Sequence, residues 1–157
     1  MTATESSENE GLLVRRIRNG TVIDHIDAGE ALNVVKILGI AGTTREALSI
    51  ATNVLSRNMG RKDIVKLANR ELSKEEVDRI ALISPRATIN IIRNFKVCEK
   101  KGVEIPTVIE GLVHCPNPGC ISNTNEPIRS RFRVSPEGLH CYYCDWVIPR
   151  DVTGHII

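Results

Sequence analysis

"LSKEEVDRIALISPRATINIIRNFKV", residues 72–97, defines the architecture of the first two thirds of this 157-residue chain. It opens with a capping box, in which Ser73 precedes a helix and Glu76 follows three positions later. Pro85 marks the end of that helix, because proline has no N–H to donate. From residue 87 to 97 the apolar side chains alternate, which is typical of a strand. The stretch therefore predicts a helix followed directly by a strand.

A similar unit precedes it. "RNGTVIDHI", residues 18–26, combines an Asn19-Gly20 turn signal with β-branched residues and predicts a strand. Asp27 and Glu30 then form a second possible capping box before a helix that stops at Gly39. The apolar residues at helical spacing in this second helix are Leu32, Val35 and Leu38.

The region between the two helices is less clear. "RKDIVKLAN", residues 61–69, predicts a strand, with Val65 and Leu67 on one face and lysines on the other. "TTREALSIATNVLS", residues 43–56, has both helix and strand features, and local propensity does not separate them. If it is extended, the order is βαββαβ, the ferredoxin-like pattern. The expected fold class is therefore α+β, with a ferredoxin-like domain followed by a small antiparallel β domain.

Composition sets the expected domain boundaries. Residues 1–11 are polar and acidic and predict a disordered leader, residues 12–105 the first domain, and residues 106–157 the second. "EKKGVEIP", residues 99–106, is expected to be the linker. The N-terminus has no basic-then-apolar signal, and no apolar run reaches the ~18 residues of a spanning helix. We expect a cytoplasmic protein without a membrane partner.

Four of the five cysteines lie in two short stretches, "HCPNPGC" (114–120) and "HCYYCDW" (140–146). Two such hooks joined by a loop can place four sulfurs ~2.3 Å from one Zn²⁺ ion. In a reducing compartment, clustered cysteines are more often metal ligands than disulfides. The spacing predicts one zinc ion per chain, and four ordinary thiols are the alternative. The predicted ligands are Cys115, Cys120, Cys141 and Cys144.

Four thiolates leave no coordination position for water or substrate, so the predicted metal is structural rather than catalytic. His114 and His140 each precede a cysteine and are the alternative ligands, although four thiols already complete a tetrahedral shell. Cys98 stands alone after a predicted strand, where we expect a small, buried side chain without special reactivity.

Charge and motif content weigh against two function classes. Residues 106–157 contain four arginines, no lysine and five acidic residues, a net charge of −1, which argues against nucleic-acid binding by the metal module. The module is better explained as a protein-docking unit. The first domain has no phosphate-binding glycine loop, no nucleophile–base pair and no paired carboxylates, so nothing in it predicts an enzyme.

Several polar residues on the predicted strands of the first domain suit a phosphate-bearing ligand. Lys66 and Lys100 lie on or near strand ends, and a lysine is a point charge suited to phosphate. Asp24 and His25 are suited to a ribose or a base amine, and Asn90 adds a polar group. Each of these residues taken singly is equally compatible with an ordinary solvated side chain.

Several motifs of the chain, in the same order, closely resemble the regulatory chain of aspartate carbamoyltransferase. They are "RNGTVIDHI", "MGRKDIVK", "LSKEEVDRIALISPRATIN" and "CPNPGCISN" with a following "EP". The resemblance implies a non-catalytic subunit of pyrimidine biosynthesis. CTP and UTP would inhibit and ATP would activate, and partners would be the catalytic chain and a second regulatory chain. It also implies that "EALSIATNVL" is a strand.

The resemblance further implies roles for individual residues. The nucleotide site would comprise Val14, Arg16, Ile17, Val22, Asp24, His25, Lys66, Asn90, Ile92, Val97 and Lys100. Within that site the lysines would meet the phosphates, and the backbone from Val14 to Ile17 would meet the base. Asn117 and Glu126 would face the catalytic chain.

Overall fold

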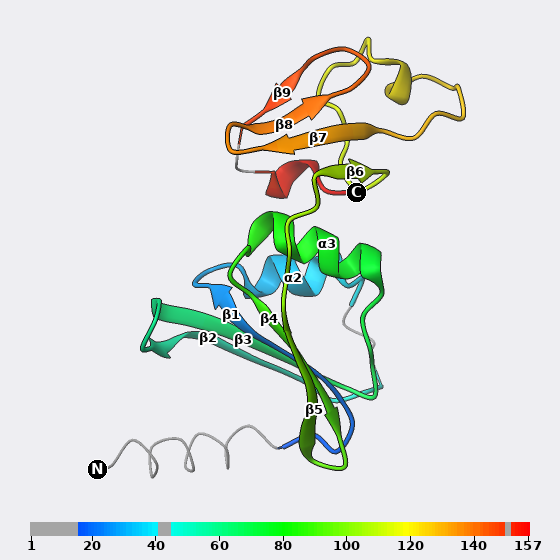
Figure 1. Cartoon of the computed structure of the whole chain (residues 1–157). Coiled ribbons are helices and arrows are strands. Elements are labelled where there is room, and N and C mark those ends of the chain that lie inside the picture. The colour runs from blue at the N-terminus through cyan, green and yellow to red at the C-terminus, as the bar shows by residue number, and fades with distance from the viewer. Residues whose placement is uncertain (1–15, 41–44, 150–151) are drawn as a thin grey trace.

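The computed structural model describes residues 16–40, 45–149 and 152–157 of the chain, so the expected leader and Val14 lie outside the described residues. Two antiparallel sheets are present, a five-stranded one from the first part of the chain and a four-stranded one from the second. The two α-helices lie on one face of the larger sheet, between it and the smaller sheet (Figure 1). The expected α+β class is confirmed.

The larger sheet has the strand order β2-β3-β1-β4-β5. Its first four members have the ferredoxin-like order, and β5 extends the sheet beyond β4 as an additional strand. The strands are β1 (Gly20–Asp27), β2 (Leu48–Ser56), β3 (Gly60–Ala68), β4 (Thr88–Arg93) and β5 (Lys96–Gly102). The helices are α2 (Ala31–Ile37), between β1 and β2, and α3 (Lys74–Ile83), between β3 and β4.

Helix α3 forms as its sequence predicts. The Ser73 hydroxyl accepts from the Glu76 N–H at 3.2 Å, and the Glu76 carboxylate accepts from the Ser73 N–H at 3.0 Å. Ile80 and Ala81 are fully buried against the sheet, and the helix ends two residues before Pro85. Both hydrogen bonds of the capping box are therefore present, and the local sequence pattern was sufficient to predict the start of α3.

Helix α2 begins differently from the prediction. Asp27 does not cap it, because its carboxylate pairs with Arg86 at 2.9 Å. Instead the fully buried Asp63 of β3 accepts from the N–H groups of Gly29 and Ala31, and its other oxygen accepts from Asn53 of β2. The Asp63 carboxylate therefore binds both the start of α2 and the stretch of β2 where its register with β3 shifts, between Ala51 and Val54.

The buried side of α2 does not include Leu32, one of the three apolar residues at helical spacing. Ala31, Val34 and Leu38 are buried, whereas Leu32 is 69 % exposed. The helix stops at Gly39 as predicted, and Gly39 has the positive φ of 67° that favours glycine there.

Residues 87–97, expected to be one strand, form two strands joined by a tight turn at Asn94 and Phe95, both with positive φ. The first part of the expected linker belongs to β5, which pairs with β4 along its length. Cys98 is exposed, contrary to the expectation, because β5 is an edge strand that the helices do not cover. Short-range alternation did not reveal the turn.

The smaller sheet has the order β6-β7-β8-β9. Its inner face buries Ile109, Phe132, Leu139 and Ile148, next to three buried cysteines. Its strands are β6 (Val108–Glu110), β7 (Arg131–Ser135), β8 (Gly138–Cys141) and β9 (Val147–Ile148). Within the described ranges, no helix has the length and apolar character needed to cross a membrane.

Candidate metal centre and ligand-binding face

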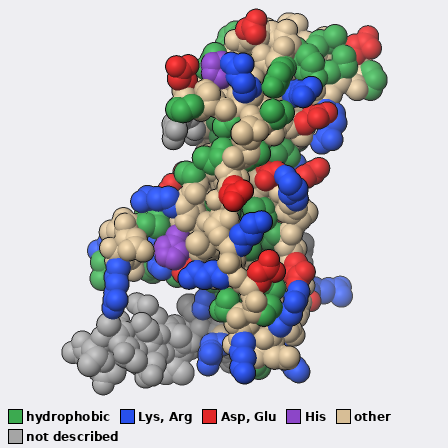
Figure 2. Space-filling model, viewed as in Figure 1, with side chains coloured by type: hydrophobic (Ala, Val, Ile, Leu, Met, Phe, Trp, Pro, Cys, Tyr) green, Lys and Arg blue, Asp and Glu red, His purple; other side chains and the backbone are tan. Residues whose placement is uncertain are grey.

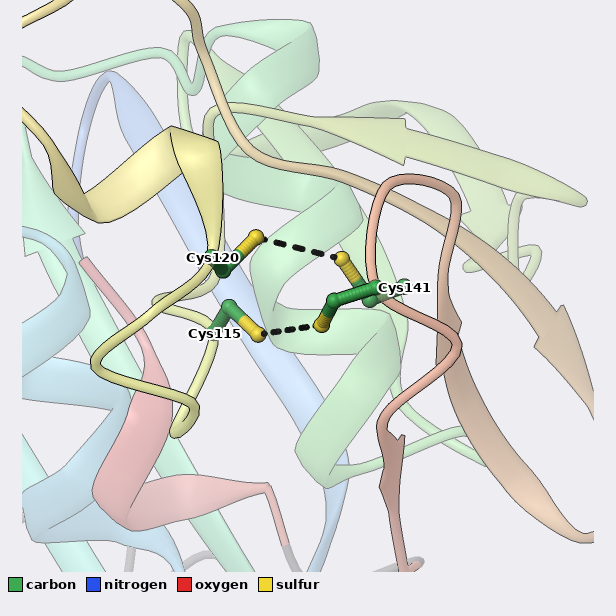
Figure 3. A group of neighbouring side chains, drawn as sticks. Cys115, Cys120 and Cys141 are labelled. Carbon is green, nitrogen blue, oxygen red and sulfur yellow. Dashed lines mark hydrogen bonds between the residues drawn. The ribbon is translucent and has the colours of Figure 1, made fainter.

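The four cysteines of the two hooks come together in the second part of the chain. Their Sγ atoms all lie within 4.8 Å of one another. Cys115 and Cys144 are 3.5 Å apart and Cys120 and Cys141 3.7 Å apart, so each close pair joins the two hooks (Figure 3). A disulfide requires ~2.0 Å, whereas a tetrahedral metal with ~2.3 Å bonds to sulfur separates its ligands by ~3.8 Å. The spacing matches a shared ion.

Each hook is held by its own backbone and by polar side chains. In the first hook, the Asn123 amide donates to the carbonyl oxygens of Cys115 and Asn117, each at 2.7 Å. In the second, the Cys141 N–H donates to the Trp146 carbonyl, and Asp145 has the positive φ that closes the turn. These contacts fix the backbone of each hook and, with it, the direction in which the sulfurs point.

The thiols differ in acidity. Burial raises the pKa values of Cys115 and Cys141. Burial also opposes ionisation of Cys144, but hydrogen bonds from the Asn117 side chain and the Trp146 backbone outweigh it and lower its pKa to about 7. Because a thiol loses its proton when it binds a metal, Cys144 is the member of this trio that is readiest to do so.

The two histidines next to the hooks are not part of the cluster that the structure describes. His114 is exposed, and the His140 ring lies 3.0 Å from the Ser135 hydroxyl. The donor set is thus four sulfurs, three of them buried, which suits a closed structural site for a thiophilic ion.

Most of the predicted ligand residues of the first domain share the sheet face turned away from α2 and α3. In the β-ladders Val22 of β1 pairs with Lys66 on one side and Asn90 on the other. Asn90 in turn pairs with Lys100 of β5. Directly paired residues point to the same face, so these four form one transverse row across four strands. Three strand spacings of ~4.8 Å place the two lysines about 14 Å apart.

Two further rows flank this one. On one side Ile92 of β4 pairs with Gly20 of β1 and with Val97 of β5, so the row is apolar. Val97 is exposed and Ile92 is buried. On the other side Asp24 pairs with Thr88. Most of the predicted site residues therefore lie in three consecutive rows, although they are distant in sequence.

Asp24 and His25 occupy an irregularity in β1. The Asp24 carboxylate forms an ion pair with Lys62 at 2.9 Å, and His25 has a positive φ of 56°. The His25 ring nitrogen Nδ1 lies 3.0 Å from the Thr88 hydroxyl. The sequence analysis did not include Lys62 among the candidate ligand residues. Lys62 lies four positions before Lys66 on the same strand, and this even spacing indicates that the two lysines are on the same sheet face.

The remaining predicted residues are more peripheral. Arg16 is exposed and Ile17 half-buried, and both precede β1 in irregular backbone. The Asn117 side chain supports the first hook by accepting from the Gly119 N–H at 3.0 Å, besides its bond to Cys144. Glu126 is exposed in the loop before β7.

Basic side chains are prominent on the β4–β5 hairpin. Figure 2 shows Lys and Arg side chains gathered over the lower end of the β4–β5 hairpin. The hairpin supplies Arg93, Lys96, Lys100 and Lys101. Lys100 lies on the face of the transverse row, whereas Arg93, Lys96 and Lys101 alternate to the other face, where Arg93 pairs with Glu71.

Two family models match the chain. The one described as aspartate carbamoyltransferase regulatory chain, allosteric domain, matches residues 12–104, and the one described as the metal binding domain of the same chain matches residues 107–153. A curated protein of Methanoregula boonei named aspartate carbamoyltransferase regulatory chain is 76 % identical, over 98 % of this chain and 95 % of its own length. Proteins with the same name from Methanoculleus marisnigri and Haloarcula marismortui are 68 % and 52 % identical, over 100 % and 97 % of this chain and 100 % and 98 % of their own lengths.

Proposed function

Because this chain belongs to the family of aspartate carbamoyltransferase regulatory chains, we propose that its first domain, residues 12–105, binds nucleoside triphosphates. CTP and UTP would act as inhibitors and ATP as an activator of partner catalytic chains in the cytoplasm. The single observation that carries this proposal is the row in which Lys66, Val22, Asn90 and Lys100 lie side by side on one sheet face.

The row suits a triphosphate. Its two ends carry ammonium groups, and long, flexible lysine side chains about 14 Å apart at their origins can reach inward from opposite sides. Val22 and Asn90 between them supply one apolar and one amide surface. Two positive charges at this spacing would neutralise much of the charge of a bound triphosphate.

The adjoining rows suit the nucleoside. The apolar row of Ile92 and Val97 lies next to the segment of Arg16 and Ile17 that enters β1, which offers backbone groups to a base. Val14, just before that segment, would complete the contact. On the other side, Asp24 and His25 would meet the ribose or an exocyclic amine, with Lys62 holding the Asp24 carboxylate in place.

The second domain, residues 106–157, would dock onto the catalytic chain, with Asn117 and Glu126 at the contact. We propose that the ion held by its four cysteines is Zn²⁺, one per chain, because a tetrahedral tetrathiolate set favours that metal. The bound ion would supply no chemistry beyond cross-linking the two hooks. The hooks themselves orient Asn117 and the loop that leads to Glu126.

Regulation then requires a difference in affinity. A nucleotide shifts the activity of a partner only if it binds two states of the assembly unequally, and such coupling is typically ~1–3 kcal/mol. The two helices between the sheets connect the nucleotide face to the metal domain (Figure 1). A change in the larger sheet would reach the docked chain through them.

Calorimetric titration of the purified chain with CTP and with ATP tests the nucleotide site. Lys66→Ala and Lys100→Ala are expected to weaken binding of both nucleotides about tenfold or more, because each removes a direct charge partner of a phosphate. Lys101→Ala is the matched control. Lys101 is the next residue of β5, pairs with Ile89 and so belongs to the opposite face.

Equal losses in all three variants would show that only overall charge matters. Unchanged titrations of Lys66→Ala and Lys100→Ala would remove the assignment of this face. A carbamoyl-transfer assay of reconstituted catalytic and regulatory chains, with and without each nucleotide, would determine which effectors inhibit and which activate.

A further inference from the structure

Strand β1 contains a bulge at the point where two predicted ligand residues follow one another. Ile23 and Ile26 are both fully buried, although residues three apart in a regular strand point to opposite faces. The register with β3 shifts between them, so β1 has one residue more than β3 at this point. The extra residue leaves Asp24 and His25 both half-buried outside the core. Bulges commonly redirect side chains in this way beside functional sites.

Strand β2 has a second bulge on the other side of β3. Its register with β3 shifts between Ala51 and Val54, and the exposed Asn53 within this stretch has a positive φ of 55°. The Asn53 N–H donates to the carboxylate of Asp63 at 2.7 Å. Strand β3 is therefore flanked by a bulge on each side, and Asp63 lies between the two.

The two carboxylate oxygens of Asp63 bind these two sides separately. Oδ1 accepts from Asn53 of β2, and Oδ2 accepts from the N–H groups of Gly29 at 2.9 Å and Ala31 at 3.0 Å. Gly29 and Ala31 lie where the chain leaves β1 and enters α2, and Ile26 of β1 is the ladder partner of Asp63. One fully buried carboxylate therefore fixes β1 directly after its bulge and β2 within its own bulge.

We propose that Asp63 is a positioning residue of the nucleotide site, which fixes Asp24 and His25 without contacting the ligand; this inference rests on the proposed function. The residue before it, Lys62, lies on the opposite sheet face, where its side chain is 17 % exposed and pairs with Asp24 at 2.9 Å. A shift of β3 or of the end of β1 would move this ion pair and the contact of His25 with Thr88. Ligand-binding side chains need such support to stay within ~0.5 Å of their productive geometry.

Asp63→Asn tests this role, because an amide has one acceptor oxygen where a carboxylate has two. Either the start of α2 or the bulge of β2 must then lose its acceptor. In calorimetric titrations of the metal-loaded full chain, we expect Asp63→Asn to weaken CTP binding about tenfold. Ile80→Ala, at a fully buried position of α3, is the control for lost stability and should keep the CTP affinity of the unaltered chain. Equal weakening by both substitutions would overturn the proposal.

A double-mutant cycle identifies the residue through which Asp63 acts. If Asp63 positions His25, Asp63→Asn should have little further effect on CTP binding in a His25→Ala chain. In a Lys100→Ala chain it should have its full effect, because Lys100 lies on β5, away from both bulges. Equal effects in the two backgrounds, or an unchanged CTP titration of Asp63→Asn alone, would contradict a positioning role.

Asn53 allows a second test that leaves the buried carboxylate in place, in case Asp63→Asn does not fold. Asn53→Val should strain the β2 bulge from its exposed side, because a β-branched residue disfavours positive φ, whereas Asn53→Gly accepts that backbone conformation. Weaker CTP binding by Asn53→Val than by Asn53→Gly supports the proposal, and equal binding overturns it.

Nuclear magnetic resonance of the His25 ring separates this inference from the proposed function, because it needs no nucleotide. The ring signals are expected to shift in Asp63→Asn as the contact with Thr88 changes, and to stay unchanged in Ile80→Ala. An unaltered chain that binds no CTP would remove the proposed function, while the ring signals would still report the positioning. Unchanged ring signals in Asp63→Asn would overturn the positioning itself.

Discussion

The five-stranded sheet buries Ile23, Ile26 and Val65 completely beneath two helices, whereas the four-stranded sheet consists of strands of two to five residues beside four clustered thiols. In the first region, contiguous aliphatic burial fixes the structure, and any one side chain is a modest part of the total. In the second, few apolar residues are available, so four sulfurs around one ion must supply what burial does not. We therefore expect substitutions in the two regions to differ in how much stability they remove and in how much of the chain they unfold.

Removal of the metal is expected to have the largest effect. Binding of structural zinc in small modules contributes ~10–16 kcal/mol, so chelation should unfold β6–β9 while β1–β5 stays folded. Fluorescence of Trp146, the single tryptophan, reports on the metal region. Far-UV circular dichroism reports on the helices of the five-stranded region. In a complex with catalytic chains, gel filtration should show this chain released before its first domain melts.

Cys120→Ser should reproduce the effect of chelation, because it removes one of four ligands. Cys98→Ser is its control, as Cys98 is exposed on β5. Simultaneous melting of both regions after metal loss would contradict the contrast between them.

A cavity in the core of the five-stranded region should lower stability less than metal removal does, and it should destabilise that whole region. Ile23→Ala removes a fully buried side chain between the sheet and the helices and is expected to lower the free energy of unfolding by ~2–5 kcal/mol. Chemical denaturation followed by circular dichroism measures the loss. Stoichiometric metal uptake should persist in this variant, and its failure would show that the two regions fold as one unit.

The buried carboxylate of Asp63 gives a smaller, more local prediction. Asp63→Asn keeps the shape but loses charge-assisted acceptance from three backbone N–H groups, at an expected ~1.5–3 kcal/mol. Asp27→Asn weakens an exposed pair with Arg86, and we expect ~1 kcal/mol or less. Denaturant midpoints of the two variants should therefore separate, and equal midpoints would argue that Asp63 has no special role.

Apart from the Asp27→Asn control, loss of the helix cap should have the smallest effect of the series. Ser73→Ala leaves the Glu76 N–H without its acceptor and should destabilise the first region by ~1 kcal/mol. Thermal unfolding measures the shift, with Ser73→Asn as the variant that should restore most of the stability. A larger loss than that of Ile23→Ala would reverse the proposed ranking of burial over local capping.

The sequence predicted those features whose cause is local. The Ser73–Glu76 capping box, the alternation in β3 and the paired cysteine hooks each depend on residues a few positions apart, and each is present in the structure. The ambiguous residues 48–56 became a strand only because β3 pairs with them. The family resemblance predicted that outcome where propensity did not.

The errors share a non-local cause. The sequence offered Asp27 as the cap of α2, but Asp63, distant along the chain, accepts from the helix start. It offered residues 99–106 as a linker, but β4 provides partners for the first four of them. Helical spacing grouped Leu32 with Val35 and Leu38, but the packing of α2 leaves Leu32 exposed.

What the amino-acid order determined by itself was the set of elements with local signals and the chemistry they carry: four thiols in two hooks, and lysines alternating along strands. Which of those lysines stand together was determined only by the tertiary structure, since the register of β3, β1, β4 and β5 aligns Lys66 with Lys100. The physical reason is that a strand's hydrogen-bonding groups are satisfied by another strand, so register depends on packing and pairing across the whole sheet.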